Sequence, residues 1–98
     1  MPKPISAAEL RARLPQAAVY DARAFIPPEG AIPGARQLTL EQVQAGLLPQ
    51  APRDRPVYLI CERGAVSELI GLYLEAEGFS EVYTVTGGLA AWRALPKG

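Results

Sequence analysis

Histidine is absent from this 98-residue sequence, and cysteine and tryptophan each occur once. Without an imidazole, serine-triad hydrolysis and papain-like cysteine catalysis lack their general base. A zinc site built from cysteine and histidine has no ligands here, and one cysteine cannot form a disulfide within the chain. Any cysteine chemistry must therefore be activated by backbone dipoles and nearby charges, and we expect neither a metal nor another cofactor.

The sequence also lacks an excess of charge of either sign and a long apolar run. Ten Lys and Arg residues balance ten Asp and Glu residues, so no overall field attracts nucleic acid or an anionic membrane. No apolar stretch approaches the roughly 20 residues that cross a bilayer, and the N-terminus has no signal-peptide pattern. We therefore expect one cytoplasmic domain over residues 1–98, with no nucleic-acid or membrane partner.

The segment 57–67 combines an apolar strand, the cysteine and a tight turn. The strand runs from Val57 to Ile60 into Cys61, and Gly64 lies in the turn. Apolar residues then recur at helical spacing and predict a helix that buries one face: Val66, Leu69, Ile70, Tyr73 and Leu74. Such a turn directs backbone N–H groups and the positive end of the helix dipole into one concavity. That environment suits an anion and lowers the pKa of a cysteine thiol.

Strands and helices are predicted to alternate along the rest of the chain. Ser6 with Glu9, and Thr39 with Gln42, have the spacing of a capping box at a helix start. The helices are expected from these caps to about residues 14 and 45, from the cysteine loop to Gly78, and over 89–95. The strands are expected at 3–5, 17–21, 36–38, 57–60 and 81–86. This alternation implies a parallel sheet covered by helices on both faces.

Several polar residues near the expected edge of the sheet have more than one interpretation. Asp21 and Arg23 follow a strand, where open α/β sheets place functional groups, or they only tie down their own loop. Arg63 is either a cation beside a thiolate or a solvated charge. Ser67 either donates its hydroxyl to the sulfur or caps the helix. Cys61 itself could be a small buried apolar residue. The proline- and glycine-rich segment 25–35 is expected to be a covering loop.

Taken together, the motifs of the chain resemble those of the single-domain rhodanese-like sulfurtransferases. The segment 61–67 resembles the active-site loop C-x-x-G-x-R-S, and 19–23 resembles a strand ending in Asp-x-Arg. The segment 31–35 resembles His-Ile-Pro-Gly-Ala, with Ala31 where histidine is usual, and 87–92 resembles Gly-Gly-x-x-x-Trp. The resemblance implies an α/β fold, a three-layer α/β/α sandwich with a five-stranded parallel sheet.

The same resemblance implies a sulfurtransferase in which Cys61 is the catalytic nucleophile and carries a persulfide. Asp21 and Arg23 would support the site, and the rest of the loop would bind the substrate: Glu62, Arg63, Gly64, Ala65, Val66 and Ser67. The implied donor is thiosulfate or a related small sulfur-containing anion, and the acceptor is cyanide or a cellular thiol. A sulfur-relay protein is a further candidate partner.

Two departures from the pattern keep other functions open. Val66 stands where arginine is usual, and Glu62 adds a negative charge beside the cysteine. Both favour a non-catalytic binding or regulatory module that keeps the fold without the chemistry. A cysteine-based phosphatase or arsenate reductase also uses a strand–loop–helix anion cradle. Those enzymes need C-x5-R, and Ser67 occupies the position of that arginine.

Overall fold

The computed structural model describes residues 1–29 and 32–97. Its parallel sheet has five strands in the order β1-β5-β4-β2-β3. The strands are β1 (Lys3–Ile5), β2 (Ala18–Asp21), β3 (Arg36–Gln37), β4 (Val57–Ile60) and β5 (Val82–Val85). The helices are α1 (Ala7–Arg13), α2 (Leu40–Gln44), α3 (Ala65–Ala76) and α4 (Gly88–Arg93). The predicted α/β fold with a five-stranded parallel sheet is confirmed.

β4 lies in the middle of the sheet, and all of its residues are buried. This explains its uninterrupted apolar sequence, because a central parallel strand is covered on both faces. In the register between β2 and β4, Asp21 pairs with Ile60. The residues that follow these two strands, Arg23 and Cys61 among them, therefore emerge at the same edge of the sheet.

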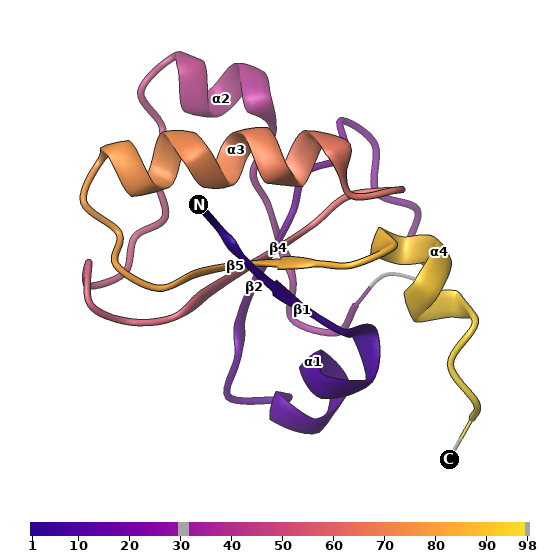
Figure 1. Cartoon of the computed structure of the whole chain (residues 1–98). Coiled ribbons are helices and arrows are strands. Elements are labelled where there is room, and N and C mark those ends of the chain that lie inside the picture. The colour runs from indigo at the N-terminus through magenta and orange to yellow at the C-terminus, as the bar shows by residue number, and fades with distance from the viewer. Residues whose placement is uncertain (30–31, 98) are drawn as a thin grey trace.

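Alternation along β4 divides the core into two layers. Val57, Leu59 and Cys61 face one layer, which is covered by α2 and α3. Tyr58 and Ile60 face the other layer, which is covered by α1 and α4. Figure 1 shows the two helix pairs on opposite sides of the strands. The expected sandwich forms because side chains of a strand alternate between its faces.

The predicted buried face of α3 was only partly correct. Ile70 and Leu74 are completely buried, but Val66, Leu69 and Tyr73 are exposed. The other buried positions of the helix are Ser67 and Gly71, which are small or polar. A Cβ at Gly71 would come within 2.6 Å of the side chain of Pro2, so this position must be small. The buried face of α3 is therefore rotated relative to the predicted one. It includes Ser67 and Gly71, which a search for apolar periodicity overlooks.

The predicted capping boxes differ between the first two helices. At α2 both hydrogen bonds form, since Thr39 accepts from the N–H of Gln42 and the Gln42 side chain accepts from the N–H of Thr39. At α1 Ser6 accepts from the N–H of Glu9, but the Glu9 carboxylate accepts from the Ser6 hydroxyl instead of the backbone. Only half of that box is present.

Three further expectations have different outcomes. No helix in the described ranges has the length and apolar character needed to cross a membrane. Ala31, which stands where histidine was usual in the resembled motif, lies outside the described residues. A single domain over residues 1–98 stays a prediction.

Candidate active site

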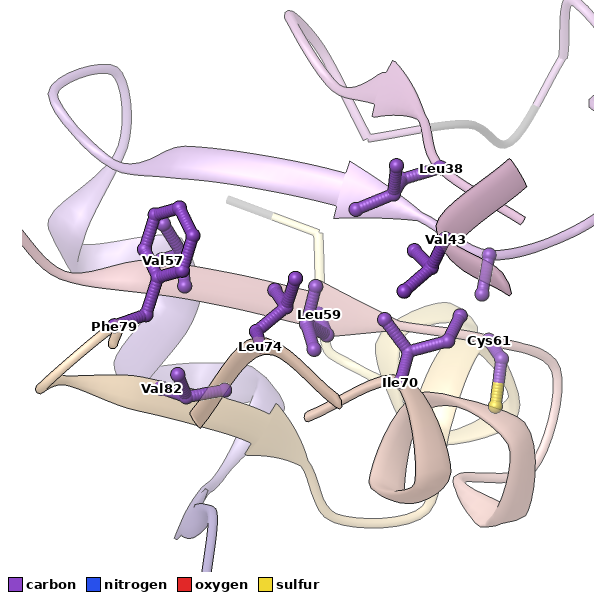
Figure 2. Packing of buried hydrophobic residues seen from close by; sticks show 10 residues of the cluster. Leu38, Val43, Val57, Leu59, Cys61, Ile70, Leu74, Phe79 and Val82 are labelled. Atoms are coloured by element: carbon purple, nitrogen blue, oxygen red, sulfur yellow. The ribbon is translucent and has the colours of Figure 1, made fainter. Parts of the chain in front are cut away.

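Cys61 lies directly after β4, at the edge where the strands end. Its side chain continues the row of Val57 and Leu59 toward α3, and Figure 2 shows the sulfur close to Ile70. Only 5% of the residue is exposed. Cys61 therefore lies at the edge of the hydrophobic core. Its reactivity depends on the polar groups that contact the sulfur.

Backbone N–H groups of the following turn point at this sulfur. The N–H of Gly64 donates to Sγ of Cys61 at 3.0 Å, and the N–H of Ser67 donates at 3.4 Å. The φ of Gly64 is 104°, a left-handed value that residues with a Cβ rarely adopt. Glycine thus lets the chain turn back over the sulfur, and the expected cradle of N–H groups closes around the Cys61 side chain.

The sulfur also takes the place of a helix cap. Gly64 is the N-cap residue of α3 and has no side chain with which to accept a hydrogen bond. Ser67 is the third residue of the helix, and its N–H is one that an N-cap side chain usually satisfies. Sγ of Cys61 accepts that hydrogen bond instead. The start of α3 and the thiol therefore depend on each other.

These contacts determine the pKa of the Cys61 thiol. Burial alone raises this pKa, because a thiolate loses hydration in apolar surroundings. Hydrogen bonds from the Ser67 hydroxyl and from the N–H groups of Ser67, Gly64 and Arg63 lower it, and together they outweigh burial. The pKa therefore lies below that of an ordinary cysteine, which favours the nucleophilic thiolate.

Ser67 is fully buried and reaches the sulfur with its side chain as well as its backbone. Its hydroxyl donates to the carbonyl of Gly64 at 3.1 Å, and its Oγ lies 3.5 Å from Sγ of Cys61. A hydroxyl has one proton. It accepts from the thiol when Cys61 is protonated, and it must leave the Gly64 carbonyl in order to donate to the thiolate. The hydroxyl contacts the sulfur as an acceptor, so its predicted donation to a thiolate stays a prediction.

A pocket of about 430 Å³ opens beside Cys61, and we call it the cysteine pocket. Its lining residues come from the β2 loop and the cysteine loop: Ala22, Arg23, Ala24, Cys61, Glu62, Arg63, Ala65 and Val66. Much of the pocket wall is apolar, and its charged side chains are both positive and negative. Within residues 1–29 and 32–97, no group of His, Cys, Asp or Glu side chains could hold a metal ion.

Asp21 and Arg23 form a paired unit at the wall of this pocket. Asp21 is fully buried, and Arg23 Nε and Nη2 both donate to its carboxylate, with the Nη2–Oδ2 distance at 2.8 Å. The backbone N–H of Arg23 donates to the same carboxylate at 3.0 Å. This forked geometry fixes the guanidinium, whose side chain is 13% exposed. The pair ties down its own loop and also places Arg23 at the pocket.

Glu62 has a partner that sequence reasoning missed. Arg93 in α4 donates to the Glu62 carboxylate from Nη1 at 2.6 Å and from Nη2 at 3.1 Å. This pairing lowers the pKa of Glu62, and the same carboxylate lies 4.0 Å from Nη1 of Arg23. The unfavourable charge expected beside Cys61 is therefore neutralised from another part of the chain.

The glycine pair that begins α4 has a direct structural role at the same loop. Gly88 has a φ of 58°, and a Cβ there would lie 2.3 Å from the carbonyl oxygen of Cys61. This close approach lets the N–H of Leu89 donate to that carbonyl at 2.9 Å, and the N–H of Ala90 donates to the carbonyl of Glu62 at 3.3 Å. The Gly87-Gly88 motif therefore allows the cysteine loop to pack directly against the start of α4.

Comparison with known proteins agrees with this architecture. The family of rhodanese-like domains matches residues 6–95, which is most of the chain. The chain belongs to the rhodanese-like domain family. Its fold is similar to that of a human single-domain sulfurtransferase, TSTD1, with a TM-score of 0.80, 18% identity and coverage of 99% of each chain. The resemblance stated from the motifs is confirmed.

Closer relatives carry informative names. The chain is 41% identical over 76 residues to a thiosulfate sulfurtransferase GlpE of Pseudomonas putida, covering 78% of this chain and 66% of that protein. A rhodanese homologue of Thermus thermophilus is 39% identical, with a TM-score of 0.73 and coverage of 91% of this chain and 99% of that chain. The match to the Pseudomonas putida protein thus spans just under two thirds of the length of that protein.

Proposed function

We propose that this rhodanese-like protein is a sulfurtransferase that moves a sulfane sulfur from thiosulfate to a thiophilic acceptor through a persulfide on Cys61. The observation that carries the proposal is the sulfur of Cys61, held by the N–H groups of Gly64 and Ser67 beside a pocket with arginine in its wall. Kinship with proteins named thiosulfate sulfurtransferase supports the choice of donor.

The first step is a displacement at sulfur. The Cys61 thiolate attacks the outer sulfur of thiosulfate, a new S–S bond forms, and the S–SO3 bond breaks with its electron pair leaving on sulfite. The enzyme retains Cys61–S–S⁻, so the total charge is unchanged. The lowered pKa of the thiol supports this step, because the thiolate is the nucleophile in exchange between sulfur atoms.

The second step returns the cysteine to its thiolate. Cyanide or a thiolate attacks the outer sulfur of the persulfide, taking that sulfur, and the Cys61 sulfur leaves as the thiolate. The N–H groups of Gly64 and Ser67 stabilise negative charge on this leaving sulfur, and the Ser67 hydroxyl adds to this once it turns from the Gly64 carbonyl to the thiolate. Neither step requires a metal, a histidine or another cofactor.

The contacts of the site support the following division of roles within the proposal. Cys61 is the nucleophile, Gly64 and Ser67 stabilise its charge, and Arg63 attracts the anionic donor. Ala65 and Val66 form apolar wall, Glu62 borders the pocket, and Arg23 is held in place by Asp21. A cytoplasmic location and a sulfur-relay protein as acceptor stay part of the proposal, and fractionation with copurification would check both.

Intact-mass measurement tests the proposal directly. The protein is incubated with thiosulfate, excess donor is removed, and the mass is recorded. We expect a gain of one sulfur atom that cyanide then removes with formation of thiocyanate. The Cys61→Ala variant should gain nothing. An unchanged mass of the wild-type protein across several sulfane donors would support the non-catalytic module instead.

A phosphatase activity has less support from the site. The position of the required arginine is occupied by Ser67, which is buried and donates its hydroxyl to the Gly64 carbonyl. The arginine that binds the oxyanion in those enzymes therefore has no counterpart at position 67. Hydrolysis of an aryl phosphate by the wild type but not by Cys61→Ser would overturn this assignment.

A further inference from the structure

Arg23 and Glu62 line the cysteine pocket, and each is paired with a residue of opposite charge that lies outside the lining. Asp21 holds Arg23 at 2.8 Å, Arg23 lies 4.0 Å from Glu62, and Glu62 is bound by Arg93 at 2.6 Å. The first three come from β2 and the cysteine loop, and Arg93 comes from α4. Arg93, the last residue of α4 and 31 positions from Glu62, completes this row.

The row determines the net charge of the rim. Asp21 cancels Arg23, and Arg93 cancels Glu62, which leaves the charge of Arg63 uncompensated. Arg63 is exposed, and in the described part of the chain it has no salt bridge. With Arg93 in place the rim is positive by one charge. Without Arg93 the negative charge of Glu62 would cancel that of Arg63.

We propose that Arg93 is a positioning residue that neutralises Glu62 and thereby makes the cysteine pocket selective for anionic reactants. The charge that remains uncompensated is that of Arg63, in a loop where Val66 takes the place of the arginine of the family pattern. The selectivity is a property of the rim and is measurable with any electrophile for Cys61. Its application to thiosulfate rests on the proposed function.

A merely structural role for Arg93 is the alternative that the geometry argues against. The side chains of Arg93 and Glu62 are each 47% exposed, and ion pairs this exposed stabilise proteins little because water and salt screen them. The loop is already held on α4 by the backbone bonds of Leu89 and Ala90. The pair therefore matters chiefly for the potential at the pocket.

The pKa of the Cys61 thiol should not change when Arg93 is replaced, which distinguishes an effect on the approach of anions from an effect on the nucleophile. Burial and the hydrogen bonds from Ser67, Gly64 and Arg63 determine that pKa, and they do not involve Arg93. The charged residues that line the pocket together with Cys61 are Arg23, Glu62 and Arg63. Replacing Arg93 should therefore change which reagents approach the thiolate far more than it changes the thiolate itself.

The experiment compares two alkylating reagents on the only cysteine of the chain. Iodoacetate is an anion and iodoacetamide is neutral, so the ratio of their rate constants reports the potential at Cys61. We expect Arg93→Ala to lower this ratio about threefold at low ionic strength, and less in high salt. The double variant Glu62→Gln/Arg93→Ala should restore the ratio although the ion pair is still absent.

Matched controls make the result specific. Arg55→Ala removes the same charge from an exposed residue of another pocket and should leave the ratio at its wild-type value. A ratio in Arg93→Ala equal to that of the wild type would overturn the proposal. A ratio in the double variant as low as that in Arg93→Ala would also overturn it, because the salt bridge between Glu62 and Arg93 would then matter for itself and not for the charge it cancels.

A thiosulfate arm links the inference to the proposed reaction. The KM for thiosulfate should rise in Arg93→Ala by a similar factor, with kcat nearly unchanged, and return in the double variant. If wild-type protein takes up no sulfur, the proposed function fails, but the alkylation ratios still decide whether Arg93 controls the charge of the pocket.

Discussion

Two pockets of the same volume, about 430 Å³ each, lie at different ends of the sheet. The cysteine pocket contains Arg23 and Arg63 at the ends of β2 and β4. The other, which we call the tyrosine pocket, contains Arg13, Arg55 and Tyr58 near the strand beginnings. Size and arginine content do not distinguish them.

The difference lies in what the polar groups face. In the tyrosine pocket, Arg13 donates to the hydroxyl of Tyr58 at 2.8 Å and lies over the stacked rings of Tyr58 and Tyr83. These groups satisfy one another. In the cysteine pocket, two N–H groups converge on one ionisable sulfur. An active site in this fold is thus distinguished by donors aimed at a reactive atom.

The largest expected effect comes from removing that atom. Cys61→Ser should reduce thiocyanate formation from thiosulfate and cyanide to the background rate, because a hydroxyl of ordinary pKa cannot replace the thiolate. Tyr58→Phe removes the polar atom at the centre of the tyrosine pocket and should retain activity close to that of the wild type. Loss of activity in Tyr58→Phe with an intact fold would break the contrast between the pockets.

Displacing the cysteine loop should have the next largest effect. In Gly88→Ala the new Cβ would clash with the Cys61 carbonyl, and misplaced reacting groups can cost about 100-fold in rate. Gly46→Ala is the matched control, because Gly46 also has a positive φ, 98°, but no atom lies within 4 Å of its Cβ position. Sulfur loading should therefore fall in Gly88→Ala only, whereas thermal unfolding should detect backbone strain in both variants.

A smaller effect is expected from one hydrogen-bond donor. Ser67→Ala removes the hydroxyl that helps to lower the pKa of Cys61, so this pKa should rise. Alkylation by iodoacetamide should then slow at neutral pH and reach the wild-type rate at high pH, where the thiol is ionised in both proteins. Ser80→Ala, which removes a hydroxyl bound to the distant Arg53 carbonyl, should leave the pH profile unchanged.

The smallest effect distinguishes arginines of the two pockets. Arg63→Ala should raise the KM for thiosulfate several-fold with little change in kcat, because the residue contributes attraction rather than chemistry. Arg13→Ala should leave both constants unchanged and only slightly lower the melting temperature, through loss of its contact with Tyr58. Equal KM values for Arg63→Ala and the wild type would show that Arg63 does not attract the donor.

Local sequence signals predicted much of this molecule. The apolar run of β4, the glycine turn and the following helix place Cys61 correctly, because each is determined by neighbouring residues. The pairing of Asp21 with Arg23 was among the interpretations for the same reason, since only two positions separate them. The order of the motifs then identified the family and the five-stranded sheet.

The features that escaped prediction depend on distant contacts. Glu62 meets Arg93 across 31 positions, and nothing in the neighbourhood of either residue signals the other. The tolerance of α3 for Ser67 and Gly71 on its buried face follows from contacts with Cys61 and Pro2. The need for glycine at position 88 follows from the Cys61 carbonyl. Each of these three features becomes apparent only in the folded structure.

The sulfur that replaces a side-chain cap on α3 joins reactivity to local order. Any group attached to Cys61 changes the acceptor for the Ser67 amide, so modification of the thiol also alters how the first helical turn is closed. Fraying of that turn is thereby coupled to the chemical form of a single atom.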